Sequence, residues 1–320
     1  MLNTLQAKLD TACDGVQDQV GIGRVADYIP ALACIDPNKF AAAVVTLDGD
    51  SATYGDAHEP FSIQSISKVF SLIAALNKAD GEVWKRVGRE PSGSPFNSIV
   101  QLENEKGIPR NPFINAGALV VSDILLQQQN ATTTGTADTG EKIVAARHDL
   151  LAFVRELAGA TELSMDLEVA RSEIATSDRN ASLAHFMAGF GNLSQPVDDV
   201  INLYCYQCSL AMSCVQLARS GLFLANRGID PITNRVVVGP ERARRVSALM
   251  MLCGHYDASG EFAFRAGIPG KSGVGGGILA IVPNQAAIAV WSPALNANGN
   301  SHAGTQALAA ITEEVGWQAL

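Results

Sequence analysis

The sequence contains no uninterrupted apolar run of the ~18 residues that a membrane-spanning helix requires. It is also poor in positive charge, because 23 Lys and Arg stand against 32 Asp and Glu and the formal net charge is −9. Contacts to phosphate groups call for clustered Lys and Arg, so this balance argues against a nucleic-acid partner. Residues 1–10 follow the pattern of an amphipathic helix rather than that of a signal peptide. We therefore expect a cytoplasmic protein with no membrane and no nucleic acid among its partners.

Cysteine is scarce, and its spacing does not favour a metal site. Six cysteines in 320 residues are typical of reduced, mostly buried thiols. Cys205 and Cys208 form a C-x-x-C pair, but a zinc site needs a second pair, and a redox site needs the pair to open a helix in a βαβ unit. This pair lies inside a long helical pattern instead. The five histidines show no H-x-x-H or H-E-x-x-H spacing. The sequence thus predicts neither a metal ion nor a cofactor.

Apolar residues, by contrast, are plentiful. Hydrophobic residues make up 47% of the chain and charged residues 17%, which fits a compact protein and argues against disorder. A chain of 320 residues can form one large domain or two modest domains, each with a substantial core.

Strand patterns occur only near the two ends of the sequence. Residues 40–47 and 51–54 flank the turn signal Asp48-Gly49-Asp50 and predict a hairpin, and residues 278–282 and 286–291 predict a second hairpin. A further short strand is predicted at 236–238. Helical patterns near the ends cover residues 2–20, 240–252 and 301–315, the last with Ser301 as its N-cap. Between the two groups of strands, helices are predicted at 62–79, 116–129, 141–158, 166–190 with a break near 175–177, and 196–226.

This distribution predicts an α+β fold. An antiparallel sheet built from both ends of the chain would be flanked by the terminal helices, and an all-α domain would be inserted between its strands. We place the sheet domain at residues 1–70 and 228–320 and the helical domain at residues 71–227. Active sites are common at such domain junctions.

One segment of the helical region lacks any apolar periodicity. Residues 127–140 are polar and contain no bulky apolar side chain, so we expect an exposed loop there.

Ser65 and Lys68 form a Ser-x-x-Lys motif at the junction. If Ile66, Val69 and Phe70 mark the buried face of a helix, Ser65 and Lys68 lie one turn apart and their side chains can meet. A serine hydroxyl becomes a strong nucleophile when a base removes its proton, and a lysine can act as that base when its pKa is lowered. Alone the motif is weak, because an amphipathic helix with an N-terminal serine explains it equally well.

A second motif precedes the second hairpin. The segment 267–272 ends like a nucleotide-binding P-loop, but Arg265 occupies the position of the first glycine that a P-loop requires, and more glycines rather than a helix follow Lys271 and Ser272. A Gly-rich bulge on an edge strand would be purely structural. Alternatively, Lys271-Ser272-Gly273 matches the K-[ST]-G signature of serine acyl-transfer enzymes. That interpretation predicts that the strand edge directs a cation and a backbone N–H into the cleft facing Ser65.

Taken together, these motifs resemble those of bacterial glutaminases of the serine-dependent type, which share their fold with β-lactamases and penicillin-binding proteins. The resemblance extends from about residue 20 to the end of the chain, and residues 127–147 form a connection longer than is usual in that family. The matching stretches are 61–70, 112–118, 172–173 with 179–180, 204–209, 253–257 and 271–278.

The resemblance implies hydrolysis of L-glutamine to L-glutamate and ammonia. Ser65 would form a glutamyl ester with Lys68 as its base, and the backbone N–H groups of Ser65 and Val274 would form the oxyanion hole. Tyr256 would pass a proton to the leaving ammonia and Tyr204 would lie next to Lys68, although the two tyrosines could also have the reverse roles.

The same resemblance implies how an amino acid would be bound. Glu173 would pair with the substrate ammonium, and Asn115 and Asn180 would hold its polar ends. Tyr204, Tyr256, Val274 and Ser65 would complete the substrate site. The family also implies a homodimer or homotetramer.

Two alternatives remain open. A β-lactamase or peptidase-like acyl hydrolase would want an Asn two residues after the middle Ser or Tyr, and Tyr206 occupies that position after Tyr204. A catalytically inactive binding protein on the same fold would tend to lose Ser65 or Lys68, and both are present.

Overall fold

The computed structural model describes residues 2–93, 99–132 and 139–317. Its central element is a five-stranded antiparallel sheet with the strand order β2-β1-β8-β7-β6. Strands from the two ends of the chain meet at its centre, where Ala41 of β1 lies opposite Trp291 of β8. The predicted antiparallel sheet and both predicted hairpins are therefore confirmed. The strands are β1 (Ala41–Thr46), β2 (Ser51–Gly55), β6 (Gly270–Ser272), β7 (Gly277–Val282) and β8 (Ala286–Trp291).

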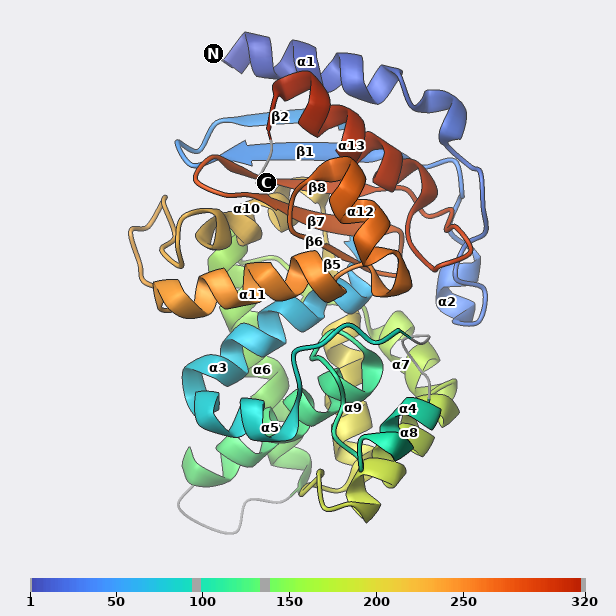
Figure 1. The fold of residues 1–320 in the computed structure, drawn as a ribbon, viewed down its shortest axis with the longest axis vertical. Coiled ribbons are helices and arrows are strands. Elements are labelled where there is room, and N and C mark those ends of the chain that lie inside the picture. Colours follow the sequence, from blue (N-terminus) through green and yellow to red (C-terminus); the bar gives the residue numbers. More distant parts are fainter. Residues whose placement is uncertain (1, 94–98, 133–138, 318–320) are drawn as a thin grey trace.

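The terminal helices cover one face of this sheet. Helices α1 (Leu2–Asp14) and α13 (His302–Val315) lie side by side over it, in blue and red at the top of Figure 1. Because successive side chains of a strand point to opposite faces, Ile288 and Val290 pack under these helices. The Ser301 hydroxyl accepts a hydrogen bond from the Gly304 N–H and caps α13, as predicted. The first helix is shorter than predicted, because it ends at Asp14 and a short 3₁₀ turn, η1 (Gln17–Gln19), follows.

Helix α10 (Cys214–Ala225) covers the opposite face, and α11 (Pro240–Cys253) packs against α10 and β6. Gly221 makes close packing possible, since a Cβ there would lie 2.8 Å from Leu279 Cδ1 and 3.2 Å from Ile281 Cδ1. Although α10 belongs to the segment 71–227 that the sequence assigns to a helical domain, it packs on the sheet. The division into two domains stays a prediction.

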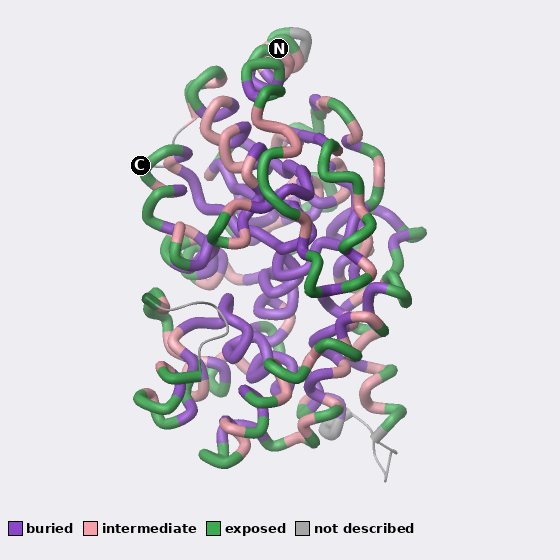
Figure 2. The backbone as a smooth tube through the Cα atoms, turned by 90° about the vertical axis from the view of Figure 1, so that its right-hand side faces the viewer, coloured by how far each residue is buried: buried purple, intermediate pink, exposed green. Residues whose placement is uncertain are grey.

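Helices α3 to α9 form the second half of the molecule, below the sheet in Figure 1. The short α2 (Pro30–Ala33) precedes β1, and α12 (Ser259–Ala266) packs against α11 and α13 on the sheet side. One apolar core continues from the α10 face of the sheet into these helices, and Figure 2 shows buried backbone running through the centre of both halves. None of the described helices is long and apolar enough to cross a membrane. The helices of this half are α3 (Ser67–Arg86), α4 (Val100–Asn104), α5 (Asn115–Thr132), α6 (Thr139–Ala158), α7 (Leu167–Ala175), α8 (Asp178–Gly189) and α9 (Val197–Cys208).

A small second sheet lies between the two halves, and the sequence did not predict it. It has the order β3-β5-β4, with β3 (Phe61–Ser62), β4 (Ser164–Met165) and β5 (Leu210–Met212). Strand β5 divides the single helix predicted at 196–226 into α9 and α10. Strand β3 delays the helix predicted to start at residue 62 until Ser67. Strands of two or three residues are too short to leave a periodic pattern, so only the pairing of distant segments reveals them.

Three further predictions can be compared with the structure. The break predicted near 175–177 is confirmed, because α7 ends at Ala175 and α8 begins at Asp178. The strand predicted at 236–238 is wrong, since only an isolated bridge between Ile229 and Val236 forms there. The loop predicted at 127–140 is wrong at both of its ends, because α5 continues to Thr132 and α6 starts at Thr139. Glutamine is a good helix former, so the polar run at 127–129 is compatible with a helix. Residues 133–138 lie outside the described part of the chain.

We expect Gly221→Val to lower the free energy of unfolding by about 1–3 kcal/mol, because the added methyl groups would collide with Leu279 and Ile281. The matched control is Gly81→Val in α3, where a Cβ would meet nothing within 4 Å. Denaturant titration of both variants tests this expectation, and equal effects would contradict the close packing of α10 on the sheet.

Candidate active site

Ser65 lies where the small sheet passes into the helical half. It is in the 3₁₀ turn η2 (Gln64–Ile66), between β3 and α3, and is 5% exposed. The preceding Gln64 has φ = 51°, a left-handed conformation that is unfavourable for residues other than glycine. Ser65 therefore precedes α3 rather than lying on it, and the prediction that Ser65 and Lys68 share one continuous α-helix is wrong in this detail.

Lys68 lies in the first turn of α3 and is fully buried. Its Nζ donates hydrogen bonds to Asn115 Oδ1 at 2.7 Å and to the Phe113 carbonyl at 3.3 Å. Burial lowers the pKa of Lys68 to about 8, so a minor fraction of the amine is neutral at pH 7 and the fraction grows as the pH rises. A buried amine with this pKa can serve as a general base.

Asn115 connects three of the predicted site residues. It begins α5, and its Oδ1 also accepts a hydrogen bond from the Tyr204 hydroxyl at 3.2 Å, while its Nδ2 donates to Asn180 Oδ1 at 2.9 Å. The Lys68 Nζ lies 5.6 Å from the centre of the Tyr204 ring. Burial raises the pKa of Tyr204, so its hydroxyl stays protonated. Tyr204 is thus next to Lys68, in the position that the sequence analysis favoured for it.

Glu173 of α7 is the buried carboxylate of the site. Its Oε2 accepts a hydrogen bond from Gln64 Nε2 at 3.3 Å, and Gln64 Nε2 also donates to Ser62 Oγ at 3.0 Å. Burial raises the pKa of Glu173 to about 7, and the Gln64 hydrogen bond and the charge of Lys68 oppose this shift. A buried carboxylate of this kind can accept charge-assisted hydrogen bonds from a cationic ligand.

Tyr256 approaches Ser65 from the sheet side. It has φ = 55°, a left-handed conformation like that of Gln64. Burial raises the pKa of Tyr256, whereas a hydrogen bond with Ser65 lowers it in part. A phenol in this position can exchange a proton with a group that is bound at Ser65.

Val274 lies in the tight turn that joins β6 to β7. The Gly276 N–H donates to the Gly273 carbonyl at 3.0 Å and closes the turn. A Cβ on Gly273 would lie 2.4 Å from the Ile63 carbonyl oxygen and 3.3 Å from the Ser65 nitrogen, and one on Gly275 would lie 2.2 Å from the Ser62 carbonyl oxygen. Glycine on both sides of Val274 is therefore required for the turn to press against the backbone of Ser65.

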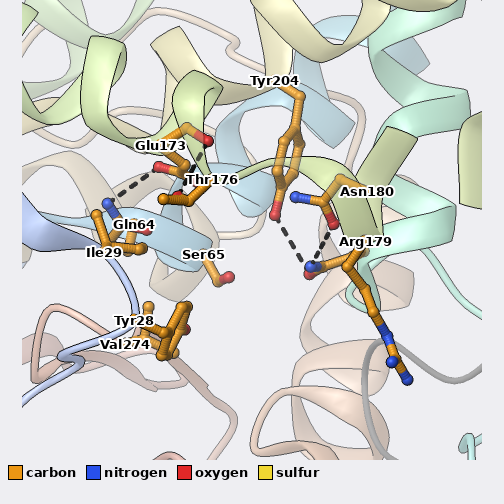
Figure 3. A pocket seen from close by; sticks show the side chains of 11 residues that line it. Tyr28, Ile29, Gln64, Ser65, Glu173, Thr176, Arg179, Asn180, Tyr204 and Val274 are labelled. Carbon is orange, nitrogen blue, oxygen red and sulfur yellow. Dashed lines mark hydrogen bonds between the residues drawn. The ribbon is translucent and has the colours of Figure 1, made fainter. Parts of the chain in front are cut away.

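These elements surround a pocket of about 190 Å³. Figure 3 shows Ser65 near its centre, with Glu173 and Gln64 on one side and Tyr204 and Asn180 on the other. Of the predicted site residues, Ser65, Asn115, Glu173, Asn180, Tyr204 and Val274 line this pocket. Tyr256 lines a neighbouring hollow, together with Tyr28 and Val274.

Five lining residues were not predicted. Gln64 and Arg179 adjoin Ser65 and Asn180 in stretches that the sequence analysis singled out, so their positions carried a signal. Tyr28 and Ile29 come from the segment before β1 and reach the pocket through tertiary packing alone. The unpredicted lining residues are Tyr28, Ile29, Gln64, Thr176 and Arg179.

The Lys271 side chain does not lie where the sequence predicted it. It is fully buried and is not among the residues that line the pocket, so the expected cation in the cleft is wrong. Its Nζ lies 4.4 Å from the centre of the Tyr256 ring. Because β6 runs behind Tyr256, the lysine reaches the tyrosine rather than the cleft.

Cys205 and Cys208 are free, buried thiols on α9. Burial raises the pKa of Cys208, and its thiol makes a hydrogen bond with Glu173. Within residues 2–93, 99–132 and 139–317, no group of three His, Cys, Asp or Glu side chains is arranged to hold a metal ion.

Known proteins are similar to this chain over nearly its whole length. The family model described as Glutaminase matches residues 23–320. A glutaminase of Agrobacterium fabrum is 54% identical over 316 residues, which cover 99% of this chain and 98% of the relative. A thermolabile glutaminase of Rhizobium etli is 55% identical over 313 residues, which cover 98% of this chain and 97% of the relative.

Solved structures agree with the sequence relatives. The probable glutaminase ybaS superposes with a TM-score of 0.88 at 34% identity and covers 99% of this chain and 98% of its own. A structure described as Mglu in its tris and glutamate form superposes with a TM-score of 0.84 at 36% identity, covering 98% of this chain and 66% of the other.

The antiparallel sheet built from both chain ends, with helices between its strands and a buried serine–lysine pair at the junction, defines a protein of the β-lactamase-like fold. Within that fold, the chain belongs to the glutaminase family.

The two shifted pKa values predict how activity depends on pH. Lys68 must be neutral to act as a base, so we expect kcat/KM for an amide substrate to rise as the pH increases through about 8. Glu173 must be ionised to bind a cation, which adds a second loss of activity below a pH of about 7. Initial rates measured across this range check both the rise through pH 8 and the loss below pH 7.

Lys68→Arg keeps the charge but cannot act as a base, so it should lose most of the activity at every pH. An unchanged profile in that variant would contradict the role of Lys68.

Proposed function

We propose that this protein hydrolyses L-glutamine to L-glutamate and ammonia through a glutamyl ester on Ser65. The observation that carries the proposal is the buried Ser65–Lys68 pair, which lies beside a pocket with a buried carboxylate, in a chain 54% identical to a glutaminase. The glutamate named in the description of one structural neighbour also fits this substrate.

The proposed ester forms with the help of the groups that surround Ser65. Lys68 removes the proton of the Ser65 hydroxyl, and the serine oxygen attacks the side-chain amide carbon of glutamine. The backbone N–H groups of Ser65 and Val274 stabilise the negative oxygen, and the glycine on either side of Val274 lets them converge. Tyr256 donates its proton to the amide nitrogen as the carbon–nitrogen bond breaks and ammonia leaves.

Hydrolysis of the ester reverses these proton transfers. Water gives a proton to the Tyr256 phenolate as it attacks the ester carbon, and the Lys68 ammonium returns a proton to the Ser65 oxygen. Both groups regain their starting states, and the sum is glutamine plus water giving glutamate plus ammonia.

Substrate binding rests on charge and hydrogen bonding at the two sides of the pocket. Glu173 accepts hydrogen bonds from the substrate ammonium, and Gln64 holds this carboxylate in place. Asn180 and Tyr204 line the opposite side, where the Asn180 amide N–H groups can donate to the substrate carboxylate. The Asn115 amide, hydrogen-bonded to both of these residues, has a second N–H that can do the same. The cytoplasmic location and the homodimer or homotetramer stay predictions from the sequence.

Removal of the nucleophile tests the mechanism. We expect Ser65→Ala to reduce ammonia release from glutamine by at least about 10⁴-fold, because the ester can no longer form. Ser67→Ala is the matched control, since the Ser67 hydroxyl is buried with no hydrogen-bond partner among the described residues. The same assay with asparagine and with a chromogenic β-lactam defines the substrate class. Intact glutamine hydrolysis in Ser65→Ala would overturn the ester mechanism.

Glu173→Gln tests recognition of the substrate ammonium. A hydrogen bond to a charged group contributes about 1.5–3 kcal/mol, so we expect the KM for glutamine to rise about 10- to 150-fold. A glutamine analogue without the α-amino group should bind both proteins equally, and inhibition constants measure this. Glu168→Gln, an exposed carboxylate of the same helix α7, serves as the control. An equal loss for the analogue would assign Glu173 a structural role instead.

A further inference from the structure

Lys271 is a second buried lysine near Ser65, and its amine faces two carbonyls and an aromatic ring. Its Nζ donates to the Gly254 carbonyl at 3.1 Å and to the Ser272 carbonyl at 2.5 Å, and it lies 4.4 Å from the centre of the Tyr256 ring. A lysine ammonium has three donors and no acceptor, so this set of two carbonyls and one ring face matches the charged form. Burial and the charge of Lys68 lower the pKa of Lys271.

The segment that carries Tyr256 is held tightly in an unfavourable conformation. The Ser259 hydroxyl donates to the Tyr256 carbonyl at 2.8 Å and accepts from the His255 N–H at 3.1 Å. The Gly254 carbonyl accepts from the Ser272 N–H as well as from Lys271. A Cβ on Gly254 would lie 1.8 Å from the Gly270 carbonyl oxygen, so the segment presses directly on β6.

The hydrogen bonds to this segment all involve backbone atoms of Gly254, His255 and Tyr256, whereas the Lys271 amine also faces the Tyr256 side chain. The Ser259 hydroxyl and the main chain of β6 fix where the Tyr256 Cα lies, but they do not determine the direction of its ring. The Lys271 amine faces the ring itself, and it also bonds to the Gly254 carbonyl, two residues before Tyr256, and to the Ser272 carbonyl of its own strand β6. It is therefore placed to set the ring direction, and with it the hydroxyl that meets Ser65.

We propose that Lys271 is a positioning residue for the reaction, which holds the ring of Tyr256 so that its hydroxyl delivers a proton to the group leaving from Ser65. This inference rests on the proposed function, because it assumes that an amide nitrogen must be protonated as it departs. In this proposal, the lysine of the Lys271-Ser272-Gly273 motif positions Tyr256 and does not contact the substrate. Lys271 contacts no substrate, so it affects the rate and not the binding.

The first test replaces Lys271 by Met, which has a similar length and no charge. We expect kcat for glutamine to fall about 100-fold, as a misplaced catalytic group typically costs, while KM changes by less than about threefold. Lys85→Met, at an exposed position of α3, is the control and should keep wild-type constants. An unchanged kcat, or a KM that rises as much as kcat falls, would overturn the inference.

A second test changes the leaving group. The thiolate of a γ-thioester of L-glutamate departs without needing a proton, so Lys271→Met should release the first equivalent of thiol nearly as fast as the wild type. Tyr256→Phe should show the same pattern, with a large loss on glutamine and a small one on the thioester. A Lys271→Met variant that is equally slow on both substrates would have a general structural defect, which contradicts the inference.

A double-mutant cycle ties the effect to Tyr256. If Lys271 acts through the tyrosine hydroxyl, Lys271→Met combined with Tyr256→Phe should be hardly slower than Tyr256→Phe alone. If the rate loss of the double variant equals the product of the two single losses, Lys271 acts independently of the Tyr256 hydroxyl, which contradicts the inference. Lys271→Arg keeps a cation that can stack on the ring and should recover part of the rate, and it takes the place of Met in the cycle if the Met variant does not fold.

The wild type separates this inference from the proposed function. Absence of ammonia release from glutamine by the wild type would refute the proposed function, whatever Lys271 does. Wild-type hydrolysis that Ser65→Ala abolishes and Lys271→Met leaves intact would refute the inference alone.

Discussion

The site depends on a lysine amine held inside the protein. Lys68 is fully buried, and its two protein acceptors are the Asn115 side chain and the Phe113 carbonyl, both neutral. Neutral acceptors stabilise the charged amine less than a directly bonded carboxylate would, so burial dominates and the pKa falls to about 8. Glu173 is close enough to influence Lys68, but within the described part of the chain no ion pair joins the two side chains, and burial raises the pKa of Glu173 to about 7. Separation of the two groups leaves one free to act as a base and the other free to bind a cation.

This arrangement requires three parts of the chain to converge. The start of α3 supplies Lys68, the start of α5 supplies Asn115, and α9 supplies Tyr204. The Asn115 side chain connects them, because its oxygen accepts from both Lys68 and Tyr204 and its nitrogen donates to Asn180. The same asparagine therefore orients the base and one wall of the pocket.

Backbone strain marks the reacting centre from both sides. Gln64, directly before Ser65, has φ = 51°, and Tyr256 has φ = 55°. Conformations of this kind cost of order 1–3 kcal/mol each and persist only where surrounding contacts hold them. Gln64 is held by Ser62 and Glu173, and Tyr256 by Ser259, while Lys271 packs against its ring. The two strained residues are therefore the one that precedes Ser65 in the chain and the one whose side chain forms a hydrogen bond with it.

The sequence by itself determined the α+β fold, the two hairpins from opposite ends of the chain and the position of the Ser65–Lys68 motif, because these features leave local periodic or spaced patterns. Only the tertiary structure decided the rest. The three short strands of the second sheet, the contribution of Tyr28 and Ile29 to the pocket and the place of Lys271 behind Tyr256 all depend on contacts between segments far apart in the chain. Local pattern shows which residues face a core, but the neighbour that a buried charge meets there is decided by packing.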